Sequence, residues 1–150
     1  LTNGEVTRAH YARYLVQIGK VSNDGQAFKR YLGGGKSCFV KAEWVDIPTA
    51  IDTIHAAGGV AVIAHPMRYN MTGKWIRRLI VDFKQWGGDG MEVSDSGQTK
   101  DQRQYLARLA NEYDLAASLG SDFHFPCGWI ELGKNLFLPE EVKPIWTLFE

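Results

Sequence analysis

Two segments of the chain place acidic or histidine side chains directly after a short apolar run. Asp122 and His124 follow the run at 115–118, and His65 follows the run at 60–64. In an extended strand end, residues two apart point to the same face, so Asp122 and His124 would lie together. A carboxylate and an imidazole are ordinary ligands for Mn²⁺, Zn²⁺ or Fe²⁺.

Each of these residues taken alone also fits a structural interpretation. Asp122 could cap the turn that follows it, His124 could be a surface residue, and His65 could be a satisfied structural histidine. Two separate strand ends with ligand-type residues favour a metal site, because a parallel fold brings such ends together. The sequence therefore predicts a divalent metal site made of His65, Asp122 and His124.

Further acidic and polar residues stand in or just after the apolar segment at 90–93. Glu92 lies inside this segment, and Ser94 and Asp95 follow it. A buried carboxylate is costly unless it is paired or coordinated. Glu92 therefore either orients the metal ligands through hydrogen bonds, without binding the metal itself, or points to a solvated edge. The sequence leaves both interpretations open, and the same alternatives hold for Ser94 and Asp95.

Basic side chains offer two places to hold a phosphate. Arg8 and His10 open the first helix after Thr7, a possible N-cap. The free N–H groups and dipole of a helix start favour an anion, and Arg8 can bind a phosphate with two hydrogen bonds. The alternative is that Arg8 and His10 are solvated first-turn residues. Arg68 is a second cation expected near the metal site.

The elements that must position these residues follow from the spacing of apolar side chains. A helix over 7–19 and a short helix after Asn23 or Asp24 make a small helical part that ends at 33–35. From about residue 45 helices alternate with strands. Helices are predicted around Ile51 and Ile54, over 75–83, over 105–113 and, at the end of the chain, over 145–149. Strands are predicted at 60–64, 90–93 and 115–118, with a fourth candidate at 136–138.

This alternation predicts an α/β fold, in which a parallel sheet, open or closed into a barrel, is covered by helices. Ligands of both architectures bind at the carboxyl ends of the strands. His65 and Asp122 fall at such ends.

Composition narrows the class of protein. The chain has 150 residues, 45% of them hydrophobic and 23% charged, which is ordinary for a globular domain and unlike a disordered one. The net charge is zero, so an anionic ligand needs a local site. No apolar run approaches the roughly 20 residues that span a bilayer. Two cysteines, Cys38 and Cys127, favour a reducing cytoplasm. The start at Leu1, without methionine, is expected of a segment from a longer protein.

Three more residues could take part in chemistry. Cys127 could be a thiolate ligand, although a buried free cysteine fits as well. Trp129 could stack on a base or pack in the interior. His55 falls inside a helix with no partner in view and is interpreted as structural.

The pairing of Ala64-His65-Pro66 with Gly120-Ser121-Asp122-Phe123-His124, separated by helix–strand units, resembles the last motifs of the PHP (polymerase and histidinol phosphatase) family. Segments 8–15, 29–32, 65–70 and 91–93 narrow the resemblance to 3′,5′-nucleoside bisphosphate phosphatases and related 5′→3′ exoribonucleases, the TrpH/YciV type. It covers essentially the whole chain, and its joint pattern is specific.

The resemblance implies a fold and a division of the chain. Residues 45–150 would be the C-terminal part of a distorted (β/α)7 PHP barrel, and residues 1–44 part of a helical insertion subdomain on the substrate phosphate side. Two or three divalent ions, typically Mn²⁺, would bind there. Among their ligands the resemblance implies His65, Asp122 and His124.

The resemblance also implies substrate contacts. Arg8 and His10 would grip a substrate phosphate, and Arg68 would have a substrate-side role. The substrate would be a nucleotide or a short RNA, hydrolysed at a phosphate ester.

The sequence departs from the family in what it lacks. Nothing in it matches the family's opening Asp-x-His-x-His motif, its Thr-Asp-His, its bridging glutamate or the histidine that joins that glutamate. We therefore expect an incomplete and inactive half that works with a missing N-terminal PHP half. The alternatives are a non-catalytic remnant that binds nucleotide or phosphate, and another PHP activity such as histidinol-phosphate hydrolysis.

Overall fold

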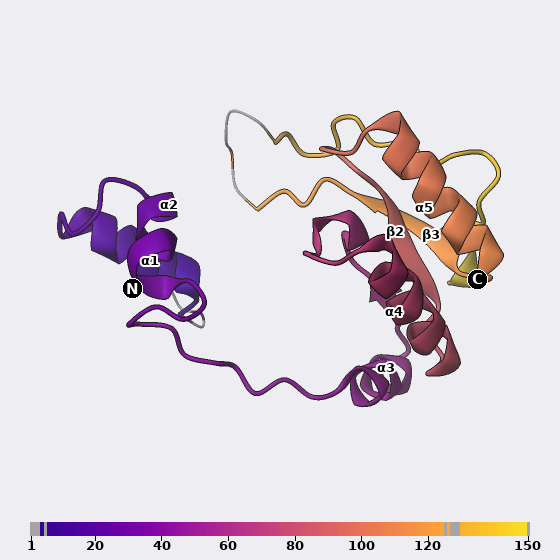
Figure 1. Cartoon of the computed structure of the whole chain (residues 1–150), viewed down its shortest axis with the longest axis horizontal. Coiled ribbons are helices and arrows are strands. Elements are labelled where there is room, and N and C mark those ends of the chain that lie inside the picture. Colours follow the sequence, from indigo (N-terminus) through magenta and orange to yellow (C-terminus); the bar gives the residue numbers. More distant parts are fainter. Residues whose placement is uncertain (1–3, 5, 125, 127–129, 150) are drawn as a thin grey trace. The chain divides into compact units, whose positions relative to one another are not determined.

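The computed structural model describes residues 4, 6–124, 126 and 130–149. The chain divides into two compact units, Leu1–Trp44 and Val45–Glu150 (Figure 1). The assignment of the first to an inserted subdomain and of the second to a barrel stays a prediction. No helix in the described ranges is long and apolar enough to cross a membrane.

The first unit is a small helical cluster. It contains α1 (Arg8–Gln17), α2 (Asp24–Ala27) and a π-helical turn η1 (Phe28–Leu32). Asn23 begins α2, because its side chain accepts a hydrogen bond from the Gln26 N–H at 3.0 Å. The buried side chains that hold the cluster together are Ala12, Val21, Ala27 and Leu32.

The second unit is built on a parallel three-stranded sheet. Its elements are α3 (Ile47–Ala56), β1 (Val62–Ile63), the 3₁₀ turn η2 (Pro66–Arg68), α4 (Gly73–Gln85), β2 (Gly90–Asp95), α5 (Lys100–Glu112), β3 (Ala116–Gly120) and the 3₁₀ turn η3 (Ile145–Leu148). The strand order is β1-β2-β3. Both strand pairs are parallel, with Gly90 opposite Val62 on one side and Ala116 on the other. The predicted α/β class with a parallel sheet is confirmed.

One continuous core joins the sheet to its helices. Ile76, Ile80 and Phe83 of α4 pack in the same cluster as Leu106 and Leu109 of α5. The strands contribute Met91, Val93 and Ala117, and α3 contributes Ile51. Because α4 follows β1 and α5 follows β2, each helix returns the chain to start the next strand in the same direction (Figure 1). All three strands therefore end at the same edge of the sheet.

The predicted elements differ from the observed ones in three places. β1 covers only two of the five apolar residues at 60–64. The fourth predicted strand, at 136–138, is wrong: these residues have no regular structure. The predicted final helix is a single 3₁₀ turn. The chain just before this turn is hydrogen-bonded to β3, because the Ala117 N–H donates to the Lys143 carbonyl at 2.7 Å.

Candidate active site at the carboxyl ends of the strands

His65 leaves β1 in a conformation that few side chains adopt. Its φ is 33° and its ψ is 55°, in the left-handed region, where a residue other than glycine is uncommon and is often found at a functional site. Its ring packs edge-on against the Tyr69 ring, with 5.8 Å between the two ring centroids. The Tyr69 hydroxyl donates to the Ala64 carbonyl at 2.7 Å. The His65 Nδ1 is buried and has no hydrogen-bond partner among the described residues.

Glu92 holds the backbone of His65 from β2. The His65 N–H donates to Glu92 Oε2 at 2.5 Å, and Glu92 is 9% exposed. Burial raises the pKa of Glu92, while the hydrogen bond from His65 lowers it and the neighbouring carboxylates of Asp95 and Asp122 raise it further. The interpretation of Glu92 as a solvated-edge residue is therefore wrong.

The close approach of β3 depends on a glycine. A Cβ at Gly120 would lie 2.6 Å from Glu92 Oε1, closer than a non-bonded carbon and oxygen can approach. Gly120 therefore leaves room for the Glu92 carboxylate between the strand ends.

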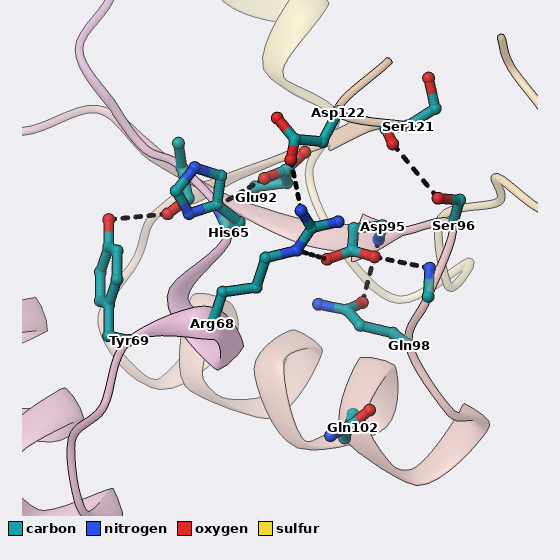
Figure 2. Close-up of polar contacts among 12 residues, drawn as sticks. His65, Arg68, Tyr69, Glu92, Asp95, Ser96, Gln98, Gln102, Ser121 and Asp122 are labelled. Carbon is teal, nitrogen blue, oxygen red and sulfur yellow. Dashed lines mark hydrogen bonds and ion pairs between the residues drawn. The ribbon is translucent and has the colours of Figure 1, made fainter. Parts of the chain in front are cut away.

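Arg68 lies between two carboxylates (Figure 2). Its Nε donates to Asp95 Oδ2 at 3.1 Å, and its Nη1 donates to Asp122 Oδ2. Asp95 is 2% exposed and also accepts from the Gly97 N–H at 2.6 Å, so it is a fixed anchor. The hydrogen bond to Asp95 raises the pKa of Arg68, which is charged at any ordinary pH. The structure thus places Arg68 at the strand ends, where Asp95 positions it; its substrate-side role stays a prediction.

Asp122 and His124 lie close together for a reason other than the predicted one. β3 ends at Gly120, and Asp122 has a φ of 54°, so the two residues are not on an extended strand. The chain turns instead, and the His124 Nδ1–H donates to the Asp122 carbonyl at 2.8 Å. The same nitrogen lies 3.7 Å from Asp122 Oδ1, with the His124 side chain 72% exposed.

The predicted metal ligands are brought together only in part. His65, Glu92 and Asp122 converge at one edge of the sheet (Figure 2), and the unpartnered Nδ1 of His65 suits a metal ligand. Asp122 is engaged by Arg68, however, and no three His, Cys, Asp or Glu side chains in the described part of the chain are arranged to hold an ion. His65, Asp122 and His124 stay predicted ligands that need further groups. Cys127 and Trp129 lie outside the described residues.

The predicted phosphate-binding residues stand on the first turn of α1. The Thr7 N–H donates to His10 Nδ1 at 3.0 Å, so His10 caps the helix and leaves Nε2 for other contacts. Arg8 is exposed and borders a pocket of about 460 Å³, whose other lining residues are Tyr11, Tyr14, Leu15, Leu32, Cys38 and Val40. Both residues stay substrate-side predictions.

Sequence reasoning missed partners that long-range packing provides. The position of Asp95 directly after a strand is a signal for a site residue, but it does not identify Arg68 as its partner. His55 has a partner after all: its Nε2 lies 2.7 Å from Asp89 Oδ2, which also accepts from the Ala61 N–H at 2.6 Å. No sequence signal connects residues 34 positions apart, so this contact could not be predicted.

Similarity to known proteins indicates a class of reaction, which the geometry of the strand ends does not identify by itself. No protein-family model matches the chain. It is 80% identical over 149 residues to a 5′-3′ exoribonuclease of Haemophilus influenzae, covering 99% of this chain and 54% of that protein. It is 41% identical over 146 residues to a 3′,5′-nucleoside bisphosphate phosphatase of Chromobacterium violaceum, covering 97% of this chain and 51% of that protein.

Two solved structures share the fold. An amidohydrolase from Chromobacterium violaceum, with bound sulfate and no metal, matches with a TM-score of 0.81 and 40% identity over 95% of this chain and 50% of that one. A protein from Bifidobacterium adolescentis described as a candidate metal-dependent phosphoesterase matches with a TM-score of 0.65 and 28% identity over 99% of this chain and 51% of that one.

The chain spans about half the length of the curated relatives it matches. These likenesses agree with the resemblance that the motifs carry: over almost its whole length, the chain is similar to about half of proteins named 5′-3′ exoribonuclease and 3′,5′-nucleoside bisphosphate phosphatase, and to about half of a solved structure described as a candidate metal-dependent phosphoesterase.

Proposed function

We propose that the chain works within a protein of its relatives' length, called the full-length protein below, as a metal-dependent phosphoesterase acting on nucleotides. The substrates would be 3′,5′-nucleoside bisphosphates, the 5′ ends of RNA, or both. The observation that carries the proposal is the convergence of His65, Glu92, Asp122 and Arg68 at one edge of the sheet. The names of the relatives support the substrate class.

The residues of this chain have distinct roles in the proposal. His65, Asp122 and His124 contribute ligands for divalent ions, with Mn²⁺ favoured and Zn²⁺ or Fe²⁺ as alternatives. Ions so placed would polarise a phosphoryl oxygen and offset its charge. Glu92 fixes the backbone of His65 and thereby orients its ring. The remaining ligands come from outside this chain, in keeping with the absence of a three-ligand cluster in its described ranges.

Arg68 offers the positive charge at this edge for a substrate phosphate. Asp95 holds its guanidinium, so little rotamer freedom is lost when a phosphate binds. Arg8 and His10 grip a further phosphate from the helical unit, at the start of α1. We propose that residues 45–150 complete a PHP barrel, with residues 1–44 part of its inserted subdomain. The low cysteine count supports a cytoplasmic protein.

A non-catalytic role is the second candidate, and one observation favours it. Arg68 already neutralises Asp122, so these strand ends can be stable without metal. In that case the chain would bind nucleotide or phosphate without turnover.

Phosphate release separates the two candidates. The full-length protein should release inorganic phosphate from adenosine 3′,5′-bisphosphate or hydrolyse a 5′-phosphorylated oligoribonucleotide when Mn²⁺ is present. This chain alone should not. If the full-length protein binds the bisphosphate but hydrolyses it with none of Mn²⁺, Zn²⁺ and Fe²⁺, the non-catalytic role is established instead.

A further inference from the structure

A small cavity lies beside the strand-end site, between η2 and the turn that joins β2 to α5. Its volume is about 170 Å³. Pockets that hold a whole small molecule are larger, roughly 300–1,000 Å³. The cavity can therefore take one group of a larger ligand whose other parts lie outside it. Its lining residues are Met67, Arg68, Asp95, Gly97, Gln98 and Gln102.

Gln98 presents a buried hydrogen-bond donor that nothing in the described part of the chain accepts. The residue is 9% exposed, and its Nε2 has no partner there. Its Oε1 accepts from the Asp95 N–H at 3.0 Å, which fixes the amide with Nε2 on the other side. A buried donor without an acceptor is unfavourable, so the Gln98 amide N–H₂ is a candidate to donate to an acceptor atom of a ligand.

Gln102, which is partly exposed, adds a second amide at the cavity. Its Oε1 accepts from the Thr99 N–H at 2.9 Å, in the capping box that begins α5. The carbonyl oxygen of each glutamine thus accepts from a backbone N–H, and the N–H₂ group of each is available as a donor. In Figure 2, Gln98 and Gln102 lie on the side of Arg68 opposite to Asp122.

The charges around the cavity argue against a phosphate as its occupant. The buried carboxylate of Asp95 lines the cavity and would repel a phosphate there, while Arg68 donates to Asp122 on the side away from the two glutamines. The backbone donors of the turn are also used, since the Gly97 N–H donates to Asp95 Oδ1 at 2.6 Å and the Gln98 N–H to the Asp95 carbonyl at 3.2 Å. The free groups are neutral amide donors, which suit a neutral acceptor.

Met67 supplies an apolar wall. It is partly buried and packs against the core of the second unit. A thioether side chain makes favourable contacts with aromatic rings. An apolar wall with two amide donors matches a planar heterocycle with ring-nitrogen or carbonyl acceptors at its edge.

We propose that this cavity binds the nucleobase of the nucleotide whose phosphate ester is hydrolysed. The inference rests on the proposed function, and it adds Gln98 and Gln102 as the residues that select a nucleotide over a sugar phosphate.

Isosteric substitutions test the cavity. Gln98→Glu and Gln102→Glu each keep the oxygen that accepts the backbone N–H and replace the free donor with an acceptor. Gln104→Glu makes the same charge change at an exposed position of α5 and is the matched control. In the full-length protein, each cavity variant should raise KM for adenosine 3′,5′-bisphosphate roughly 3- to 15-fold, with kcat nearly unchanged. KM for the base-free 1-deoxyribose 3,5-bisphosphate should stay as in the control.

The outcomes separate this inference from the proposed function. Equal changes in KM for both substrates, or changes no larger than those of Gln104→Glu, would overturn the base assignment. If Gln98→Glu does not fold, the partly exposed Gln102→Glu carries the comparison. Binding is read independently of turnover: adenosine, which has no phosphate, should shift the NMR signals of the Gln98 side-chain amide. An unshifted Gln98 amide at saturating adenosine contradicts the inference even if hydrolysis is observed, and a shifted amide without hydrolysis contradicts only the proposed activity.

Discussion

Arg68 and Asp95 form the fixed pair at the strand ends. The Arg68 Nε lies 3.1 Å from Asp95 Oδ2, and Asp95 is nearly inaccessible while the Arg68 side chain is partly exposed. The same guanidinium reaches Asp122 through Nη1. A buried carboxylate that holds a partly exposed arginine fixes the orientation of its guanidinium.

Removing the charge of Asp95 should loosen Arg68. Asp95→Asn is expected to lower the free energy of unfolding of the full-length protein by roughly 1.5–3 kcal/mol, the range for hydrogen bonds to charged groups. Urea unfolding measures it. Arg78→Met is the control, because Arg78 pairs with Asp82 on the surface of α4 and should contribute about 0–1 kcal/mol. Similar losses for both variants would mean that Asp95 is no special anchor.

A side chain at Gly120 should disturb the site more than the fold. The Cβ of Gly120→Ala would displace the Glu92 carboxylate, which holds the His65 N–H. We expect kcat/KM to fall at least about 10-fold while the loss of stability stays near the average for point mutations, about 1 kcal/mol. Gly34→Ala is the control, since its Cβ meets no atom within 4 Å. Unchanged kinetics in Gly120→Ala would show that the position of Glu92 does not matter.

The raised pKa of Glu92 predicts a pH dependence in metal-free protein. A carboxyl whose pKa is higher in the folded than in the unfolded state stabilises the fold at low pH, and that contribution is lost as the pH rises through the folded pKa. The ordinary value is 4.5, so the loss begins above it. Glu92→Gln removes the charge and keeps an acceptor for His65. Its stability relative to wild type, from urea unfolding in a chelator, should therefore increase between pH 4 and pH 7. A difference in the free energy of unfolding between Glu92→Gln and wild type that stays constant over this pH range would contradict a pKa of Glu92 raised by burial.

Arg8→Ala should weaken substrate use and leave metal binding intact. A phosphate held by two charge-assisted hydrogen bonds gains roughly 1.5–3 kcal/mol, which corresponds to a fall of about 10- to 150-fold in kcat/KM. Arg13→Ala, another exposed arginine of α1, is the matched control. Equal kcat/KM values for the two variants would show that Arg8 is a solvated surface residue that does not bind the substrate.

The sequence predicts the layout of the site better than its contacts. The apolar run before His65 and the one before Asp122 locate two strand ends, and parallel strands must end at one edge. The turn at Asp122 could not be predicted, because spacing alone does not reveal a left-handed residue. The Arg68–Asp95 pair was also hidden, since its partners lie 27 positions apart and meet only through the order of the strands. The predicted strand at 136–138 failed because three apolar residues do not require a neighbouring strand to bury them.

Mn²⁺ content tests the central claim that this edge of the sheet holds metal. It is measured after equilibrium dialysis of the full-length protein and of its His65→Ala and His55→Ala variants. His55 is the matched histidine, because it pairs with Asp89 before β2 begins, away from the carboxyl ends of the strands. The account predicts that His65→Ala loses at least one bound Mn²⁺ per molecule while His55→Ala retains the wild-type content. A His65→Ala variant with the full wild-type content of Mn²⁺ would contradict it.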